Sequence, residues 1–279
     1  MDLHFGCTRC GKCCHDLKLP LTVAEATLWL AEGSEVQIIC EAVPWATEPG
    51  ADDLAAAHRR RRSFATLSGA LPTRISVILA ANFSGACPNL EADMRCAIYE
   101  RRPLVCRNYP AEINPFIQLD PGRKACPPEA WTEDQPLLLR DGRVMSDRIR
   151  QNSQLARDTE ALDVQVKRRL CSALNVNAAA LANEGFVVYS PQRAVLLTAL
   201  RRAIDDDGDQ TPEGGWRYIS NRFETIASLE SSGAEGFVVP ADDPMPFEYV
   251  GFHSPSPSPS PSPSPSPSPA ALAGRAGVP

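Results

Sequence analysis

The sequence predicts an α+β protein in three parts: a cysteine-rich N-terminal domain with short strands and helices, a mostly helical part, and a disordered tail. Three observations support this division. Nine of the ten cysteines lie before residue 130, long helical patterns follow Trp131, and the chain carries eight Ser-Pro repeats near its end. We expect the N-terminal domain over 1–130, a mainly helical region over 131–253 and the tail over 254–279.

The first predicted helix starts after Leu21. Thr22 is a good N-cap residue, and Glu25, three positions later, completes the pattern of a capping box. The spacing then places Ala24, Leu28 and Ala31 on one face of the helix, which we expect to be buried.

Two apolar runs predict strands, over Val36–Ile39 and Arg74–Ala81. The polar stretch over 48–62 lies between them, and we expect it to be an exposed insertion. Further on, a short helix is predicted at Tyr99–Arg101, because Pro103 cannot continue it.

The C-terminal half shows three helical patterns, over Asp147–Leu174, Pro191–Ile204 and Glu213–Leu229. Ser190 and Pro191 are a typical N-cap and first residue for the second helix. In the tail each proline fixes φ and removes a backbone donor, so we expect a semi-extended spacer that cannot form a core.

The composition excludes several classes of function. The chain has 279 residues, of which 43% are hydrophobic and 22% charged, with a net charge of −6. An acidic protein is unsuited to a broad nucleic-acid surface, and no apolar run is long enough for a transmembrane helix. The N-terminus has neither the basic nor the apolar region of a secretory signal. We expect a cytoplasmic protein without a nucleic-acid or membrane partner.

The cysteines carry the strongest chemical signal. Residues 7–14 read C-x2-C-x2-C-C, in which a two-residue gap lets a tight turn direct two sulfurs to one point, with Gly11 suited to a positive φ. Three thiolates at this spacing suit a cubane iron–sulfur cluster, with Cys87-Pro88 or Cys126-Pro127 as source of the fourth ligand. Zinc is equally compatible with thiolate ligands.

Adjacent cysteines add a geometric expectation. In an extended backbone the side chains of Cys13 and Cys14 point apart, which favours ligation of two neighbouring metal centres. Basic residues close to the cysteines in sequence would offset thiolate charge. They are Arg9, Lys12, Arg95, Arg101, Arg102, Arg107, Arg123 and Lys124.

The later cysteines sit in recognisable segments: Cys87-Pro88-Asn89-Leu90, Arg95-Cys96-Ala97-Ile98-Tyr99, Arg102-Pro103-Leu104-Val105-Cys106-Arg107-Asn108-Tyr109-Pro110 and Lys124-Ala125-Cys126-Pro127. With the opening Phe5-x-Cys7-x-x-Cys10-Gly11-x-Cys13-Cys14, they resemble the YkgJ family of cysteine-cluster proteins over roughly the first 130 residues. The family is described as a zinc- or iron-chelating domain. The resemblance implies a metal-organised domain with eight ligands: Cys7, Cys10, Cys13, Cys14, Cys87, Cys96, Cys106 and Cys126.

The function predicted on this basis is metal binding, with Zn²⁺ or an iron–sulfur cluster as cofactor and a second centre as a further hypothesis. One alternative is an iron–sulfur oxidoreductase or protein-modifying enzyme, distantly similar to the flagellin lysine-N-methylases. Another is an interaction module whose Ser-Pro tail recruits a protein partner with a groove. Cys40 and Cys171 lie outside the motif, and we expect both to be small core residues.

Overall fold

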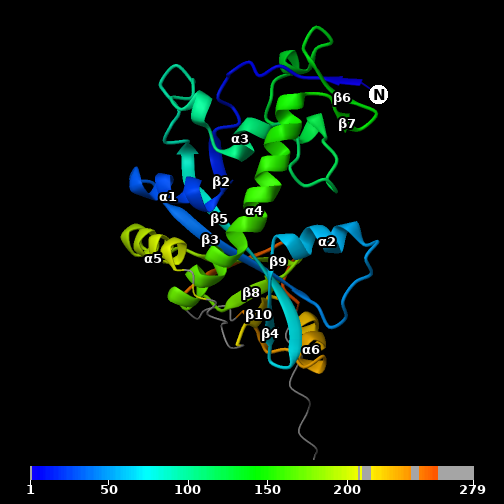
Figure 1. Ribbon diagram of the computed structural model, residues 1–279, viewed down its shortest axis with the longest axis vertical. Helices are drawn as coiled ribbons and strands as arrows, with labels where there is room; N and C mark the ends of the chain where they lie inside the picture. The colour runs from blue at the N-terminus through cyan, green and yellow to red at the C-terminus, as the bar shows by residue number, and fades with distance from the viewer. Residues whose placement is uncertain (1, 207, 209–214, 240–244, 257–279) are drawn as a thin grey trace, which may run out of the picture.

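The computed structural model describes residues 2–206, 208, 215–239 and 245–256. A nine-stranded mixed sheet crosses the middle of the molecule, and a small three-stranded sheet lies at the end that holds the N-terminus (Figure 1). The predicted combination of helices and strands is therefore confirmed. None of the helices in the described ranges is long and apolar enough to cross a membrane.

The strands are β1 (Asp2–His4), β2 (His15–Leu21), β3 (Val36–Pro44), β4 (Phe64–Ser68), β5 (Leu71–Ala86), β6 (Leu137–Arg140), β7 (Arg143–Val144), β8 (Ala178–Leu181), β9 (Gly185–Tyr189), β10 (Arg217–Ser220), β11 (Gly236–Val238) and β12 (Glu248–Gly251). The α-helices are α1 (Val23–Ala31), α2 (Leu54–Arg61), α3 (Leu104–Asn108), α4 (Asp147–Ala173), α5 (Arg193–Asp205) and α6 (Phe223–Ser231). Short 3₁₀ helices are η1 (Tyr99–Arg101), η2 (Pro121–Arg123) and η3 (Pro128–Trp131).

Strand β5 is the centre of the N-terminal half, because β2, β3 and β4 all pair with it in antiparallel orientation. Both predicted strands are confirmed inside β3 and β5, and η1 matches the predicted short helix. The strands extend beyond the apolar runs, since pairing continues as far as Pro44 and Thr73. Ladder hydrogen bonds, which do not depend on side-chain polarity, explain the extra length. Part of the polar insertion forms α2, capped by Asp53.

Helix α1 begins as predicted, with both hydrogen bonds of the capping box between Thr22 and Glu25. The predicted buried face is wrong: Leu28 is 63% exposed. The helix instead buries Val23, Ala26, Trp29 and Leu30. Several apolar stripes were available on this helix, and its packing against α5 and β5 selected this one.

The region over 131–253 is mixed α/β rather than mainly helical. Helices α4 and α5 lie close to their predicted ranges, but the third predicted helix begins only at Phe223, because residues 217–220 form β10. Strand β10 pairs in parallel with β8 and β11. Strand β3 from the first 130 residues pairs with β8 and β9, so one sheet joins the two halves. The domain boundary near 130 stays a prediction.

One large core continues through both halves. Leu30, Ile38 and Leu79 from the N-terminal half share it with Leu196 and Ile219 from the C-terminal half, and all five are fully buried. Cys40 on β3 and Cys171 on α4 belong to the same core, 0% and 2% exposed, as predicted. Helix α4 runs from the small sheet to this core (Figure 1), so it ties the cysteine-rich end to the rest of the molecule.

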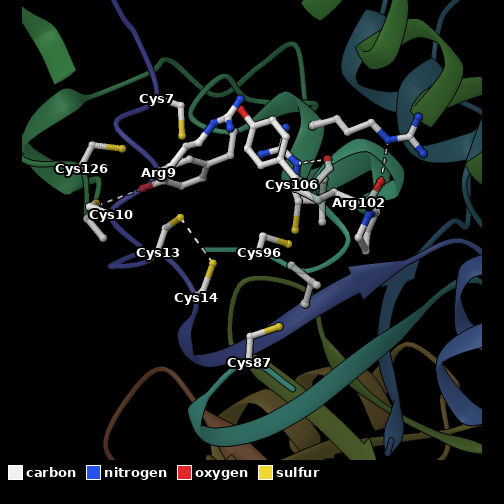
Figure 2. A pocket seen from close by; sticks show the side chains of 18 of the residues that line it. Cys7, Arg9, Cys10, Cys13, Cys14, Cys87, Cys96, Arg102, Cys106 and Cys126 are labelled. Atoms are coloured by element: carbon white, nitrogen blue, oxygen red, sulfur yellow. Dashed lines mark hydrogen bonds between the residues drawn. The ribbon is translucent and has the colours of Figure 1, made fainter. Parts of the chain in front are cut away.

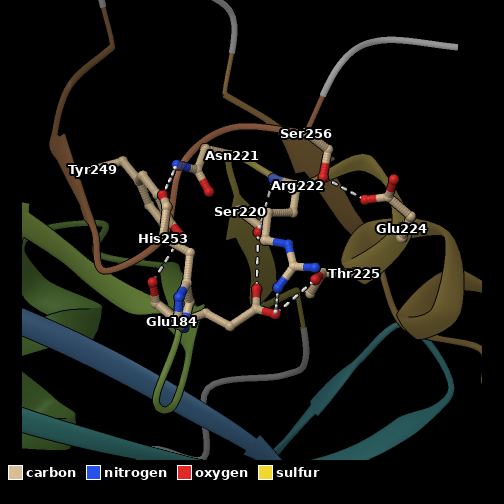
Figure 3. A network of polar contacts seen from close by, with 9 residues as sticks. All are labelled: Glu184, Ser220, Asn221, Arg222, Glu224, Thr225, Tyr249, His253 and Ser256. Atoms are coloured by element: carbon tan, nitrogen blue, oxygen red, sulfur yellow. Dashed lines mark hydrogen bonds and ion pairs between the residues drawn. The ribbon is translucent and has the colours of Figure 1, made fainter.

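The C-terminal segment is fastened by a polar network centred on Glu184, which follows β8 (Figure 3). The Glu184 carboxylate accepts hydrogen bonds from Ser220 Oγ at 3.0 Å and Thr225 Oγ1 at 2.7 Å. Asn221 Nδ2 donates to the His253 carbonyl at 2.9 Å. The segment is described up to residue 256; the disorder predicted for the remaining Ser-Pro tail lies outside the described residues.

Glu25 connects two helix starts. One carboxylate oxygen accepts the Thr22 N–H at 2.9 Å within the capping box, and the other accepts the Leu104 N–H at 2.8 Å, at the first residue of α3. Helix α3 carries Cys106. The Glu25 side chain therefore fixes the position of a predicted ligand relative to α1, a helix of the core.

The Glu25→Ala variant tests this connection. It removes a capping interaction and a charge-assisted hydrogen bond, so we expect the free energy of unfolding to fall by about 2 kcal/mol. Denaturant titration of the full chain measures it, with Glu32→Ala, an exposed residue at the other end of α1, as the matched control. A Glu25→Ala protein as stable as the control would contradict the bridging role.

Candidate metal centre

All eight predicted ligands line one cavity, with a volume of about 550 Å³. Figure 2 shows their side chains around a common space, coming from both ends of the cysteine-rich region. The cavity is bordered by the loop between β1 and β2, the end of β5, η1, α3, the segment before η3 and the start of α4. The chain thus brings together sulfurs that are up to 119 positions apart, from Cys7 to Cys126.

Strand pairing explains how the first cysteine string meets the later cysteines. Strands β2 and β5 are antiparallel, and His15 pairs with Ala86 at the end of the ladder. The residue before β2 and the residue after β5 must then be neighbours. They are Cys14 and Cys87, and the Cys87 N–H donates to the Cys14 carbonyl at 2.8 Å.

The string itself is folded by a tight turn. Gly11 has the predicted positive φ, at 69°, and its carbonyl accepts the Cys14 N–H at 2.9 Å. A Cβ at Gly11 would lie only 2.9 Å from the Met94 carbonyl oxygen, so the close approach of the 87–96 loop also requires glycine. The start of the string is held by Gly6, whose N–H donates to the Ala130 carbonyl at 2.9 Å.

The expected divergence of Cys13 and Cys14 is wrong, since their sulfurs lie 3.9 Å apart. The expectation assumed an extended backbone, whereas the Gly11 turn bends the chain here, and a turn does not alternate its side chains between two faces. Both sulfurs point into the cavity (Figure 2).

The other three cysteines are each held by local structure. Cys96 forms a bridge with Leu90 that closes the loop after β5. Cys106 lies in α3. Cys126 follows Ala125, whose N–H donates to the Tyr109 hydroxyl at 2.9 Å. Each sulfur is therefore positioned by backbone that is itself hydrogen-bonded.

The thiols of the cavity have different environments, which shift their pKa values in different directions. Contact with Cys14 raises the pKa of Cys13, and the same contact lowers the pKa of Cys14. Burial raises the pKa of Cys106 to about 12 and also raises the pKa values of Cys87 and Cys126. Arg102 acts in the opposite direction on Cys13 and Cys106, since its positive charge favours their thiolates.

Only part of the predicted basic set reaches the site. Arg9, Arg102 and Arg107 line the cavity. Arg95 instead pairs with Asp93 and is 71% exposed, and Lys124 pairs with Glu112 at 2.5 Å. The remaining predicted residues, Lys12, Arg101 and Arg123, are exposed.

The donor chemistry of the cavity is uniform. Among the described residues that line it, the acidic residues and histidine are absent, so the soft donors are the eight thiols and the thioether of Met94. In the described ranges, no three His, Cys, Asp or Glu side chains are close enough together to hold a single metal ion. Thiolates are the ligands that zinc and iron–sulfur clusters prefer, so the residues present fit either group by type.

The comparison with protein families agrees with this chemistry. Residues 6–127 match the CxxCxxCC family, whose description is "Putative zinc- or iron-chelating domain". Over this range, which is less than half of the chain, the sequence is similar to that domain. The match contains all eight cysteines of the cavity, and it confirms the resemblance on which they were chosen. No curated protein and no solved structure matches the chain significantly.

The cavity also contains residues that the sequence did not indicate. Lys18 of β2, Tyr99 of η1 and Arg148 of α4 all line the cavity. Arg148 lies outside residues 6–127 and far in sequence from any ligand, so no local pattern could reveal it. Tyr99 lies in the Arg95–Tyr99 segment around Cys96, but only the fold shows that two guanidinium groups lie over its ring.

Alkylation of the metal-free protein tests the thiol environment. The thiolate is the reacting form, so Cys14, with its lowered pKa, should begin to react at lower pH than Cys87, Cys106 and Cys126. Mass spectrometry after iodoacetamide pulses across a pH series gives the midpoint for each cysteine. Cys40, fully buried in the core, serves as the control that reports unfolding. Equal midpoints for Cys14 and Cys106 would contradict these pKa directions.

Proposed function

We propose that the CxxCxxCC domain binds iron–sulfur clusters, four thiolates to each cluster, through Cys7, Cys10, Cys13, Cys14, Cys87, Cys96, Cys106 and Cys126. The observation that carries the proposal is that all eight thiols border one cavity whose lining contains neither carboxylates nor imidazoles among the described residues. Such a centre supplies electron-transfer chemistry when it is bound. A reducing compartment such as the cytoplasm would keep the thiols available as ligands.

The size of the cavity favours a cluster over a single ion. In a structural zinc site four ligands converge on one ion at about 2.3 Å and leave no open space. Here the sulfurs border a volume of about 550 Å³, and no three described donors converge on one point. Iron and inorganic sulfide would occupy part of the space between thiols arranged in this way.

Zinc remains the second candidate because of one distance. Four sulfurs at about 2.3 Å from a tetrahedral ion are separated from one another by roughly 3.8 Å. The Cys13 and Cys14 sulfurs lie 3.9 Å apart, so this pair has the spacing of two zinc ligands. Eight thiols would also supply two four-coordinate ions.

The protein contributes orientation and exclusion of water. Phe5, Trp29 and Phe83 line the cavity beside the thiols, and apolar surroundings limit solvent access to a metal centre. The ring of Phe5 packs on Trp131 at 4.8 Å between centroids, which anchors the start of the cysteine string. These residues hold and shield a centre, whichever metal it contains.

A visible spectrum distinguishes the two metals. After anaerobic purification of the full chain, we expect a brown protein with broad visible absorption that dithionite bleaches, because an iron–sulfur cluster is coloured and redox-active. Elemental analysis of the same sample provides the metal count. A colourless protein with stoichiometric zinc would replace the first candidate by the second, and a protein that takes up neither metal would overturn both.

Cysteine substitution tests the ligand set. We expect Cys106→Ser to lose roughly half or more of the bound metal, because a cubane needs each of its thiolates. The matched control is Cys171→Ser, in the core but outside the cavity, whose metal content should equal that of the wild type. Circular dichroism verifies folding of both variants. Full metal content in Cys106→Ser would exclude this residue as a ligand.

A further inference from the structure

Two arginines share one aromatic ring at the wall of the cysteine cavity. The guanidinium carbons of Arg9 and Arg102 lie 4.2 Å and 3.6 Å from the centroid of Tyr99. Arg102 Nε also donates to the Tyr99 carbonyl at 2.7 Å. Cation–π contacts at these distances restrain the long side chains, so both charges have fixed places in the site. We call Arg9, Tyr99 and Arg102 the cationic wall; Figure 2 labels its two arginines.

The two arginines of the cationic wall are not paired with acidic side chains in the described part of the chain. Within the described part of the chain, neither Arg9 nor Arg102 forms an ion pair, although Arg95 and Lys124 nearby both do. Two fixed arginines beside the thiols, without an acidic partner, indicate that the negative charge they interact with lies in the cavity itself.

The charge of a loaded site agrees with this assignment. Eight thiolates carry eight negative charges, and two doubly positive centres, whether zinc ions or oxidised cubane clusters, offset about half of them. Five cationic residues line the cavity, which is enough to balance the remaining negative charge without a further cation. They are Arg9, Lys18, Arg102, Arg107 and Arg148.

We propose that Arg9 and Arg102, held by Tyr99, are positioning residues that neutralise the net negative charge of the thiolate-bound centre. This inference rests on the proposed function of the cavity. Arg102 is the more firmly held member, since it lies nearer the Tyr99 ring than Arg9 does and also donates a hydrogen bond to the Tyr99 carbonyl. Removal of its charge weakens metal binding and, for an iron–sulfur centre, stabilises the oxidised form, which carries less negative charge.

The variants separate charge from structure. Arg102→Gln removes the charge, whereas Arg102→Lys retains a charge but cannot reproduce the Nε hydrogen bond together with the planar contact on Tyr99. Arg95→Gln is the matched control: it removes an arginine next to Cys96 that does not line the cavity. Arg9→Gln provides a second test, because the Arg9 side chain forms a ring contact and no hydrogen bond in the described part of the chain.

The experiment uses the full chain loaded anaerobically with metal. Chelator competition measures metal affinity, and a spectroscopic redox titration measures the midpoint potential of the iron-loaded form. We expect affinity to fall about tenfold in Arg102→Gln, further in the double variant with Arg9→Gln, and less than about twofold in Arg102→Lys and Arg95→Gln. The midpoint potential of Arg102→Gln should become more negative.

Two outcomes would overturn the inference. Wild-type affinity and potential in both Arg102→Gln and Arg9→Gln would show that the cavity does not use these charges. Equal losses in Arg102→Lys and Arg102→Gln would show a structural role for the Tyr99 hydrogen bond instead. A wild-type chain that binds no metal is a different result, because it overturns the proposed function itself and the inference with it.

Discussion

The antiparallel pairing of β2 with β5 is the constraint on which the site depends. It joins the residue before one strand to the residue after the other, and thereby places Cys14 beside Cys87. The first cysteine string and the 87–96 loop then start from the same end of the ladder. A register shift of one residue would turn the strands' buried side chains outward, so the core that fixes the register also fixes the meeting of the two cysteine groups.

The loops at that end of the sheet are held by polar contacts to helices. Glu25 joins the starts of α1 and α3, and the buried Asn108 at the end of α3 accepts a hydrogen bond from Ser153 of α4 at 3.0 Å. Asn108 Nδ2 in turn donates to the Leu104 carbonyl at 3.1 Å. Helix α3, which carries Cys106, is therefore fixed at both ends to longer helices of the main core. A five-residue helix would be marginal without such contacts.

Charge and hydration act together in the cavity. Apolar and aromatic residues surround the thiols and raise the pKa values of buried members such as Cys106, which opposes the thiolate form that a metal requires. Arginines at the wall, above all Arg102, act in the opposite direction. The negative charge of eight thiolates would be balanced only with both a metal and these cations present. This agrees with the zinc- or iron-chelating description of the domain that residues 6–127 match.

The sequence by itself indicated the eight cysteines that line the cavity, the capping box at Thr22 and the turn at Gly11. The capping box and the turn rest on short spacings that backbone geometry enforces locally, whereas the later four cysteines were indicated by their resemblance to a family. Only the tertiary structure decided that Leu28 is exposed, that residues 217–220 form a parallel-paired strand of the mixed sheet, and that Arg148 reaches the cavity. These outcomes depend on which surfaces of distant elements pack together. Local patterns specify which faces are available, and packing chooses among them.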